Sequence, residues 1–406
     1  MKKLYIPAIL MFFIISALGQ NAYLTYNKAY GQLLYENYEG AIALFTQAIN
    51  EKPDIADAYS FRGLSYHKLG QLDKAIEDYI KDNSFKKDRS SYNLACAYAL
   101  QGKKDDAFRL LEQSQKSEYK KQANIIESDT DFEKLKSDPR WKNLLTADVL
   151  TPYDKLMVEV NEKFGAKNFE GSIQACEKAI GIDKADKRAW ISKAYILSQL
   201  EKNDESIAEY DKLIGIDASD FEGYAGKANV YFKLQKYSQA LPLYETAAAK
   251  NPYYMPLYEM GMCKFGTGKK DAGIEDIKKY CEIFTKDDMT LYTCGRFLYD
   301  MERDNEALIY AEKAIALNKS IPEYFMLRAY VNHVKKNWDT AISDYSQVIV
   351  ANDKNAGEAY YKRGLCKAEK FAISKNASDK SGFCSDMKSA IKHGITEAAQ
   401  YTKLCE

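Results

Sequence analysis

Residues 41–79 read AIALFTQAINEKPDIADAYSFRGLSYHKLGQLDKAIEDY. Ala41, Phe45 and Ala48 in this stretch are three or four residues apart, so their side chains share one face of a predicted helix. A proline and a second helical pattern follow, and the small-residue spacing begins again at Ala75. A helix pattern that returns at an interval of about 34 residues predicts consecutive helix hairpins.

The same small residue returns along most of the chain. Most successive steps in this series are about 34 residues long, which is a length typical of repeated helix hairpins. Each period carries two helical patterns, which are separated by Gly or Asn beside a charged residue. The sequence therefore predicts an all-α superhelix, a solenoid of about nine or ten helix hairpins. The repeating positions are Ala41, Ala75, Ala107, Ser172, Ser206, Ala240, Gly273, Ala307 and Ala341.

This pattern resembles the tetratricopeptide repeat family, whose hairpin follows Trp-x2-Leu-Gly-x2-Tyr and then Ala-x3-Phe, Ala and Pro. The resemblance extends over nearly all of the chain beyond its first residues. Two departures stand out, because the Leu position is often Lys or Arg and the closing Pro is usually absent. The leading aromatic position is filled by Trp190, Tyr59 or Tyr224, and the second helix matches best at Ala41, Phe45, Ala48 and Pro53.

An interruption lies between Ala107 and Ser172, where the step is roughly one period longer than between neighbouring hairpins. The segment 125–145 places Asp138 as a helix cap before Pro139, and an apolar face formed by Trp141, Leu144 and Leu145 follows. This segment resembles the terminator that covers the exposed face of a last hairpin. We therefore expect an N-terminal array over residues 20–148 and a C-terminal array over residues 151–406.

The first residues read as a signal peptide over residues 1–19. Lys2 and Lys3 precede an apolar stretch, and Ala17-Leu18-Gly19 supplies small residues for cleavage. About 15 apolar residues are fewer than the roughly 20 that cross a bilayer, and no second apolar run of that length follows. We expect an exported protein, periplasmic or secreted, with no transmembrane segment after cleavage.

The C-terminal end departs from the period. The step from Ala341 to Phe383 is longer than one period, and the excess lies within 370–382, where we expect a flexible loop. The last short helix has only one neighbour, so a covalent tie would oppose its fraying. Export makes a disulfide between Cys384 and Cys405 possible, with Cys366 as a competing partner of Cys384 and three reduced thiols as the alternative.

Composition argues against several functions. Lys plus Arg equals Asp plus Glu at 58 each, so no basic field attracts nucleic acid. The three histidines lie far apart, and none of the eight cysteines forms a Cys-x-x-Cys pair for zinc. No motif of a hydrolase, nucleotide-binding protein or metalloprotease is present, so we expect no catalytic residue, no metal and no cofactor. Metal binding by Asp129, Asp131 and Asp138 is the alternative to a structural role, in which two of the three cap helices.

The family resemblance implies that the first helices of successive hairpins line a concave groove. Aromatic and amide side chains recur on that face, and they suit an extended peptide or a partner helix. The alternative is that these tyrosines only pack between hairpins. The candidate partner-binding residues are Tyr195, Asn229, Phe232, Tyr292, Arg296, Tyr299, Tyr330 and His333, with Tyr23, Tyr26, Tyr30 and Ser198 on the same predicted face.

We therefore interpret the chain as an exported scaffold or adaptor for a protein or peptide partner, with envelope assembly as one setting. The alternative is a structural subunit that is stably integrated in an envelope or secretion complex. Catalysis is the least supported reading, since no convergent reactive groups are apparent.

Overall fold

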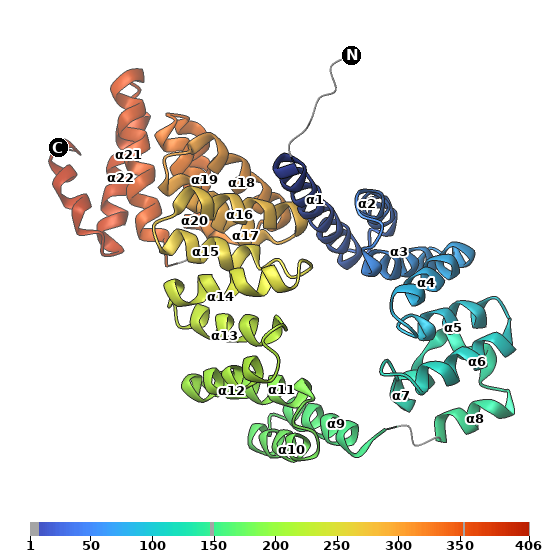
Figure 1. Cartoon of the computed structure of the whole chain (residues 1–406). Coiled ribbons are helices and arrows are strands. Elements are labelled where there is room, and N and C mark those ends of the chain that lie inside the picture. Colours follow the sequence, from blue (N-terminus) through green and yellow to red (C-terminus); the bar gives the residue numbers. More distant parts are fainter. Residues whose placement is uncertain (1–7, 147–149, 352–353, 406) are drawn as a thin grey trace. The chain divides into compact units, whose positions relative to one another are not determined.

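The computed structural model describes residues 8–146, 150–351 and 354–405, and the side chains of residues 8–20 and 146 lie outside the description. The described residues form helices and connecting turns without a β-strand (Figure 1). All side chains of the predicted signal peptide, residues 1–19, therefore lie outside the description. None of the helices in the described part combines the length and the apolar character that a bilayer crossing requires.

The chain divides into two compact units, Met1–Thr267 and Gly268–Glu406. Unit 1 contains three hairpins, then a terminator segment, then three more hairpins and one further helix, α15. The hairpins are α1/α2 (Ala8–Leu34, Tyr38–Glu51), α3/α4 (Ala56–Lys68, Leu72–Phe85), α5/α6 (Ser91–Leu100, Lys104–Gln115), α9/α10 (Pro152–Gly165, Phe169–Ile182), α11/α12 (Lys187–Gln199, Asn203–Ile216) and α13/α14 (Glu222–Lys233, Tyr237–Lys250). The terminator is α7 (Ala123–Ser128), η1 (Thr130–Leu135) and α8 (Pro139–Thr146), and α15 is Leu257–Gly266.

Unit 2 begins with a single helix and continues with three hairpins. Together with unit 1 this gives nine closely packed hairpins among the described residues, so the predicted all-α solenoid is confirmed. The elements of unit 2 are α16 (Lys270–Ile283), α17/α18 (Asp288–Asp300, Asp304–Leu317), α19/α20 (Pro322–Val334, Trp338–Val350), α21/α22 (Ala356–Ser374, Ala377–Lys392) and η2 (Thr396–Cys405).

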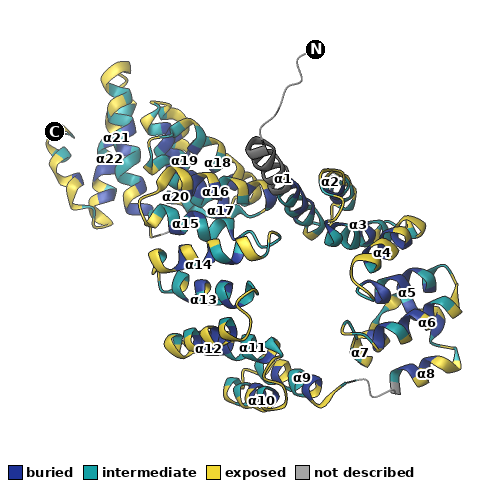
Figure 2. Ribbon diagram, viewed as in Figure 1, coloured by how far each residue is buried: buried dark blue, intermediate teal, exposed yellow. Residues whose placement is uncertain are grey.

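Small residues allow the two helices of a hairpin to approach closely. A Cβ added to Gly63 on α3 would lie 2.9 Å from the ring of Tyr79 on α4. Ala75, Ala228 and Ala240, which the period predicted as crossing points, have no exposed surface. Buried residues therefore follow the inner faces of the hairpins while the outer faces stay exposed, as Figure 2 shows.

Two positions after the end of most first helices lies one residue with a left-handed backbone. Six of the nine residues at this position are not glycine, so their Cβ atoms carry a steric cost of roughly 1 kcal/mol or more. Asn168, one of the asparagines predicted to separate the helices, lies between α9 and α10 and caps α10 by accepting a bond from the Gly171 amide; Asn37 caps α2 in the same way with Gly40. The left-handed residues are Glu36, Gly70, Gly102, Lys167, Glu201, Gln235, Gly268, Glu302 and Lys336.

At four of the positions where the family has Leu, a Lys or Arg forms a repeated buried interaction, which we call the ion-pair ladder. Lys227 holds the same position but bonds to the exposed Asp211 of the preceding hairpin. Each cation of the ladder lies on the first helix of its hairpin and bonds to a carboxylate on the second helix. The carboxylates are almost fully buried, with exposed fractions between 2% and 7%. The pairs are Arg62–Asp78, Lys193–Glu209, Arg328–Asp344 and Arg363–Asp386.

Several ladder cations also reach the preceding hairpin. Arg62 donates to Thr46 at 3.1 Å, and Arg363 donates to Ser346 at 2.8 Å. Lys193 lies 2.9 Å from Glu177 of the preceding hairpin. A single cation thus connects the two helices of its own hairpin and the hairpin before it, which an aliphatic side chain cannot do with directional bonds.

The terminator has the predicted local structure. α8 begins at Pro139, and the Asp138 carboxylate accepts a bond of 3.0 Å from the backbone amide of Arg140. Trp141 and Leu144 are buried against the preceding hairpins, while Leu145 is half-buried. Within unit 1, Lys120 before the terminator lies 2.8 Å from Asp154 on α9. The two-array boundary near residue 150 stays a prediction.

The C-terminal hairpin corrects one expectation. We expected a flexible loop within residues 370–382, but α21 continues to Ser374 and α22 begins at Ala377. The excess residues lengthen both helices, and a left-handed Lys375 followed by the capping residue Asn376 makes the turn. Its Ser-, Asn- and Lys-rich composition did not reveal this, because an exposed helix end needs no apolar pattern.

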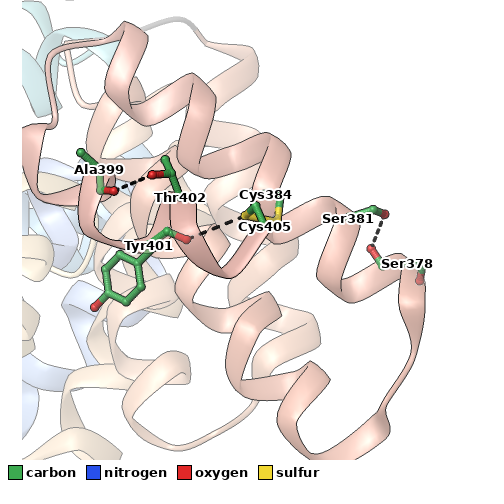
Figure 3. The surroundings of a disulfide bond; sticks show 7 residues. All are labelled: Ser378, Ser381, Cys384, Ala399, Tyr401, Thr402 and Cys405. Carbon is green, nitrogen blue, oxygen red and sulfur yellow. Dashed lines mark hydrogen bonds between the residues drawn. A yellow bond between two sulfur atoms is a disulfide. The ribbon is translucent and has the colours of Figure 1, made fainter.

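The final element η2 packs on α21 and α22 as a cap. Phe383, Met387 and Ala398 form its small core. The structure joins the sulfurs of Cys384 and Cys405, whose Cα atoms are 5.6 Å apart (Figure 3). Cys366, the competing partner considered from the sequence, is a buried free thiol, as are the five other cysteines.

Candidate partner-binding surface

Unit 2 brings five of the eight predicted partner-binding residues onto neighbouring first helices. Tyr292, Arg296 and Tyr299 follow one another along α17, and Tyr330 and His333 lie on α19. We call these five residues the α17–α19 strip. Four of them are half-buried, and Arg296 is exposed.

The tyrosines of the strip connect the two helices. The rings of Tyr299 and Tyr330 are stacked, with centroids 5.9 Å apart and planes inclined by 19°. Tyr330 also contacts the ring of Tyr345 on α20 at 6.1 Å, and burial together with a bond to Glu358 on α21 raises its pKa. Tyr292 packs against Tyr324 with centroids 5.2 Å apart. These tyrosines thus pack between hairpins and still expose part of their rings.

Arg296 is the cation at the centre of the strip. Its Nε lies 3.2 Å from the Asp300 carboxylate one turn along α17, and both side chains are more than 40% exposed. Burial lowers the pKa of Arg296, but nearby negative groups outweigh burial and raise it. Because an exposed pair of this kind contributes little stability, the guanidinium can exchange Asp300 for a partner's carboxylate at small cost.

The strip continues onto α21 through residues that the sequence analysis missed. His333 Nε2 lies 3.2 Å from the Glu369 carboxylate, whose other oxygen accepts a bond of 3.0 Å from the indole of Trp338. Glu358 on α21 likewise forms a hydrogen bond with the side chain of Tyr330. Both glutamates lie on the first helix of the last hairpin. Applying the same helical spacing to that helix could have found them, but the predicted groove included no residue from it.

Three predicted residues lie in unit 1 and are not part of this strip. Tyr195 on α11 is 48% exposed and contacts the ring of Phe164 at 5.8 Å. Asn229 on α13 accepts a bond of 2.7 Å from the hydroxyl of Tyr244 within its own hairpin. Phe232 packs against Tyr244 and a second ring on α14. Tyr195 and Asn229 are therefore exposed, while Phe232 is half-buried.

Two further residues of the predicted lining are core residues. Tyr26 on α1 is only 6% exposed and packs against Phe45 and Phe61. Ser198 on α11 is 8% exposed and donates to the backbone oxygen of Tyr195. The helical spacing was right, but spacing alone does not tell the groove from the interface with the next hairpin.

Unit 1 also contains a cavity of about 440 Å³ beside α9 and α11. Three of its charged lining groups are bonded to one another, because Asp154 lies 2.8 Å from Lys120 and 3.0 Å from Arg188. Burial raises the pKa of Asp154, but bonds from Lys120, Thr151 and Arg188 outweigh it and lower the pKa below the usual range. These three bonded charges stabilise the start of α9.

The repeated hairpins with alanine crossings and a half-buried aromatic strip on first helices define the class of helical-repeat solenoids. Family models described as tetratricopeptide repeat match residues 35–82 and 187–220. These two segments of the chain are therefore tetratricopeptide repeats. No curated protein matches it.

Several solved structures are similar. The C-terminal part of a repeat protein from Cytophaga hutchinsonii is 16% identical, with 59% of this chain and 97% of that chain covered, at a TM-score of 0.49. A tetratricopeptide repeat protein from Parabacteroides merdae is 16% identical over 62% and 98% of the two chains, at 0.42. YrrB, described as having an unusual peptide-binding site, is 22% identical over 57% and 98%, at 0.31.

Proposed function

We propose that this protein is an exported scaffold that binds a protein or peptide partner through the α17–α19 strip. The observation that carries the proposal is the combination of stacked, half-exposed tyrosines with an exposed arginine on adjacent first helices. Tyr and Arg are the residues most often found at the energetic centre of interfaces, since they combine contact area with directional hydrogen bonds.

The packing of the tyrosines supports binding rather than opposing it. Stacking between Tyr299 and Tyr330 fixes both rings before a partner arrives, so little side-chain entropy is lost on association. Arg296 offers a planar donor group for a carboxylate, and Glu358 and Glu369 border the strip on α21. We therefore expect the partner to place an apolar side chain on the rings and an acidic group beside Arg296.

Site-specific photo-crosslinking in the native host tests this surface directly. A photoreactive residue at position 300, one turn from Arg296 on α17, leaves the strip intact and should capture a discrete partner, whereas the same residue at Lys313, exposed on α18, should not. Equal capture at both positions, or capture at neither, would contradict the proposed surface.

A second experiment separates binding from packing. Tyr299→Phe keeps the ring stack, while Tyr299→Ala removes it; R296A leaves the stack intact. R296A should weaken partner capture roughly tenfold or more without changing the unfolding midpoint. If only Tyr299→Ala acts, and acts in proportion to its loss of stability, the tyrosines serve packing alone.

Export is part of the proposal and rests on the charged start and short apolar stretch of residues 1–19. Intact-mass measurement of protein from the native host should show cleavage near Gly19. Retention of Met1 to Leu18 would instead favour a membrane anchor. Salt-resistant co-purification with a large complex would favour the structural-subunit alternative.

A further inference from the structure

Four side chains with metal-binding atoms meet where the terminator covers the third hairpin of unit 1. Cys96 lies on α5, Asp129 and Asp131 lie at the start of η1, and His67 lies in the last turn of α3. The donor atoms of Cys96, Asp129 and Asp131 are all within 4.8 Å of one another. His67 Nε2 adds a fourth donor, 3.1 Å from Asp131 Oδ2.

We propose that these four residues form a zinc site that fastens the terminator to hairpins α3/α4 and α5/α6. The site is independent of the partner-binding surface, because all its ligands lie in unit 1. Its ligand would be a single divalent zinc ion bound through one sulfur, one nitrogen and two oxygen atoms.

Two of the six separations between donor atoms are close to those of a tetrahedron around zinc. With usual Zn–N, Zn–O and Zn–S bond lengths, neighbouring N and O ligands are about 3.3 Å apart and S and O ligands about 3.5 Å apart. The structure places His67 Nε2 at 3.1 Å from Asp131 Oδ2, and Cys96 Sγ at 3.7 Å from Asp129 Oδ2. Shifts of a few tenths of an ångström would bring these two edges to tetrahedral values. His67 Nε2 lies outside the group of donor atoms that are within 4.8 Å of one another, so its ring must move toward the other donors when zinc binds.

The surrounding residues hold these donors in position. Asp129 Oδ1 accepts the backbone amide of Asp131 at 3.0 Å, which directs Oδ2 toward Cys96. Tyr92 donates to the same Oδ2 at 2.7 Å, and Tyr79 places its hydroxyl 3.5 Å from Nδ1 of His67. A partner on the second ring nitrogen is the usual arrangement around a metal-binding histidine, since it fixes the ring and its tautomer.

The chemistry of the donors selects zinc over magnesium or calcium. Sulfur and imidazole ligands favour zinc and other late transition metals, whereas the hard cations require oxygen ligands alone. Cys96 is only 3% exposed, but the Asp131 side chain is 29% exposed and gives the ion a path of entry. Cys96 would bind as its thiolate and release one proton to the solvent.

Cobalt substitution in the full chain tests the site, because a thiolate bound to Co²⁺ gives a charge-transfer band that oxygen ligands do not. We expect the metal-stripped protein to bind one equivalent of Co²⁺ with tetrahedral spectra, and Zn²⁺ to displace it. Cys96→Ser should abolish the charge-transfer band, while Cys176→Ser, at a buried thiol of α10, should retain it.

Two further variants keep the test decisive should Cys96→Ser fold poorly. Asp131→Asn, at a partly exposed side chain, and His67→Gln should each weaken Co²⁺ and Zn²⁺ binding at least tenfold while circular dichroism stays unchanged. A wild-type protein without the cobalt spectrum, or a charge-transfer band that survives Cys96→Ser, would overturn the proposal.

Discussion

Arg328→Met would break one rung of the ion-pair ladder in unit 2. Arg328 donates from Nε and Nη2 to the two oxygens of Asp344, at 2.8 and 2.7 Å. Asp344 is only 2% exposed, so water cannot replace the lost bonds without opening the hairpin. Methionine fills the space of the aliphatic stem and leaves the carboxylate without its cation.

The magnitude follows from the burial of the carboxylate. Removing one partner of a buried ion pair costs about 3–5 kcal/mol, because the remaining charge stays desolvated. The bidentate geometry and the raised pKa of Arg328, which its bond to Asp344 causes, place this pair among the strong ones. Replacing both members, as in R328M/D344L, removes the stranded charge, and such replacements are often neutral or stabilising.

Urea unfolding of the full chain, followed by circular dichroism, measures both effects. We expect R328M to lose about 3–5 kcal/mol in the transition of unit 2 and the double variant to recover most of that loss. R296M is the matched control, since the exposed Arg296–Asp300 pair should change stability by less than about 1 kcal/mol. A loss below about 1 kcal/mol in R328M, or a double variant as unstable as the single one, would refute the reasoning.

Three further outcomes are expected. The pKa of Asp154 is lowered in the folded state, so its contribution to stability is present above its usual pKa of 3.8 and is lost as the pH falls below that value. Urea unfolding midpoints measured between about pH 6 and 3 should therefore decline less steeply in Asp154→Asn than in wild type. Gln235→Gly should stabilise unit 1 by up to about 1 kcal/mol in urea unfolding, because φ is 57° there, whereas Gln235→Ala should bring no gain. Cys405→Ser should remove roughly 3 kcal/mol of local stability from the cap, seen as faster amide exchange in η2, while Lys403→Ser at an exposed position should leave the exchange unchanged. Free Cys384 and Cys405 in a non-reducing peptide map of native protein would contradict the disulfide.

The hairpins were predictable because they are local. Ala41, Ala75 and Ala240 repeat at fixed intervals since each hairpin needs a small residue where its helices cross, and that requirement is written into every period. The terminator was equally visible, because Asp138 and Pro139 are adjacent residues that together specify a helix start.

The ion-pair ladder could not be predicted by comparing one sequence position at a time with the family pattern. Arg62, Arg328 and Arg363 looked like departures from an apolar position, and only the packed structure supplies the carboxylates that face them. The family pattern gives Leu as the usual residue at this position. The carboxylate that pairs with the arginine lies on another helix, 16 residues away in two of the three cases.

The binding surface was only partly predictable for a related reason. Helical spacing placed Tyr26 and Tyr330 on the same kind of face, yet Tyr26 is covered by neighbouring rings and Tyr330 is half-exposed. Which of two such residues meets solvent depends on the hairpin that packs beside it.

The sequence by itself determined the helix period, the position of the caps and the absence of a net charge, since these depend on neighbours within about one helical turn or on composition alone. Only the tertiary structure decided which thiol, imidazole and carboxylates meet. Cys96 and Asp131 lie on separate elements of the chain, and His67 belongs to yet another hairpin. No spacing rule could join them, because their proximity follows from how successive hairpins stack and how the terminator folds back on them.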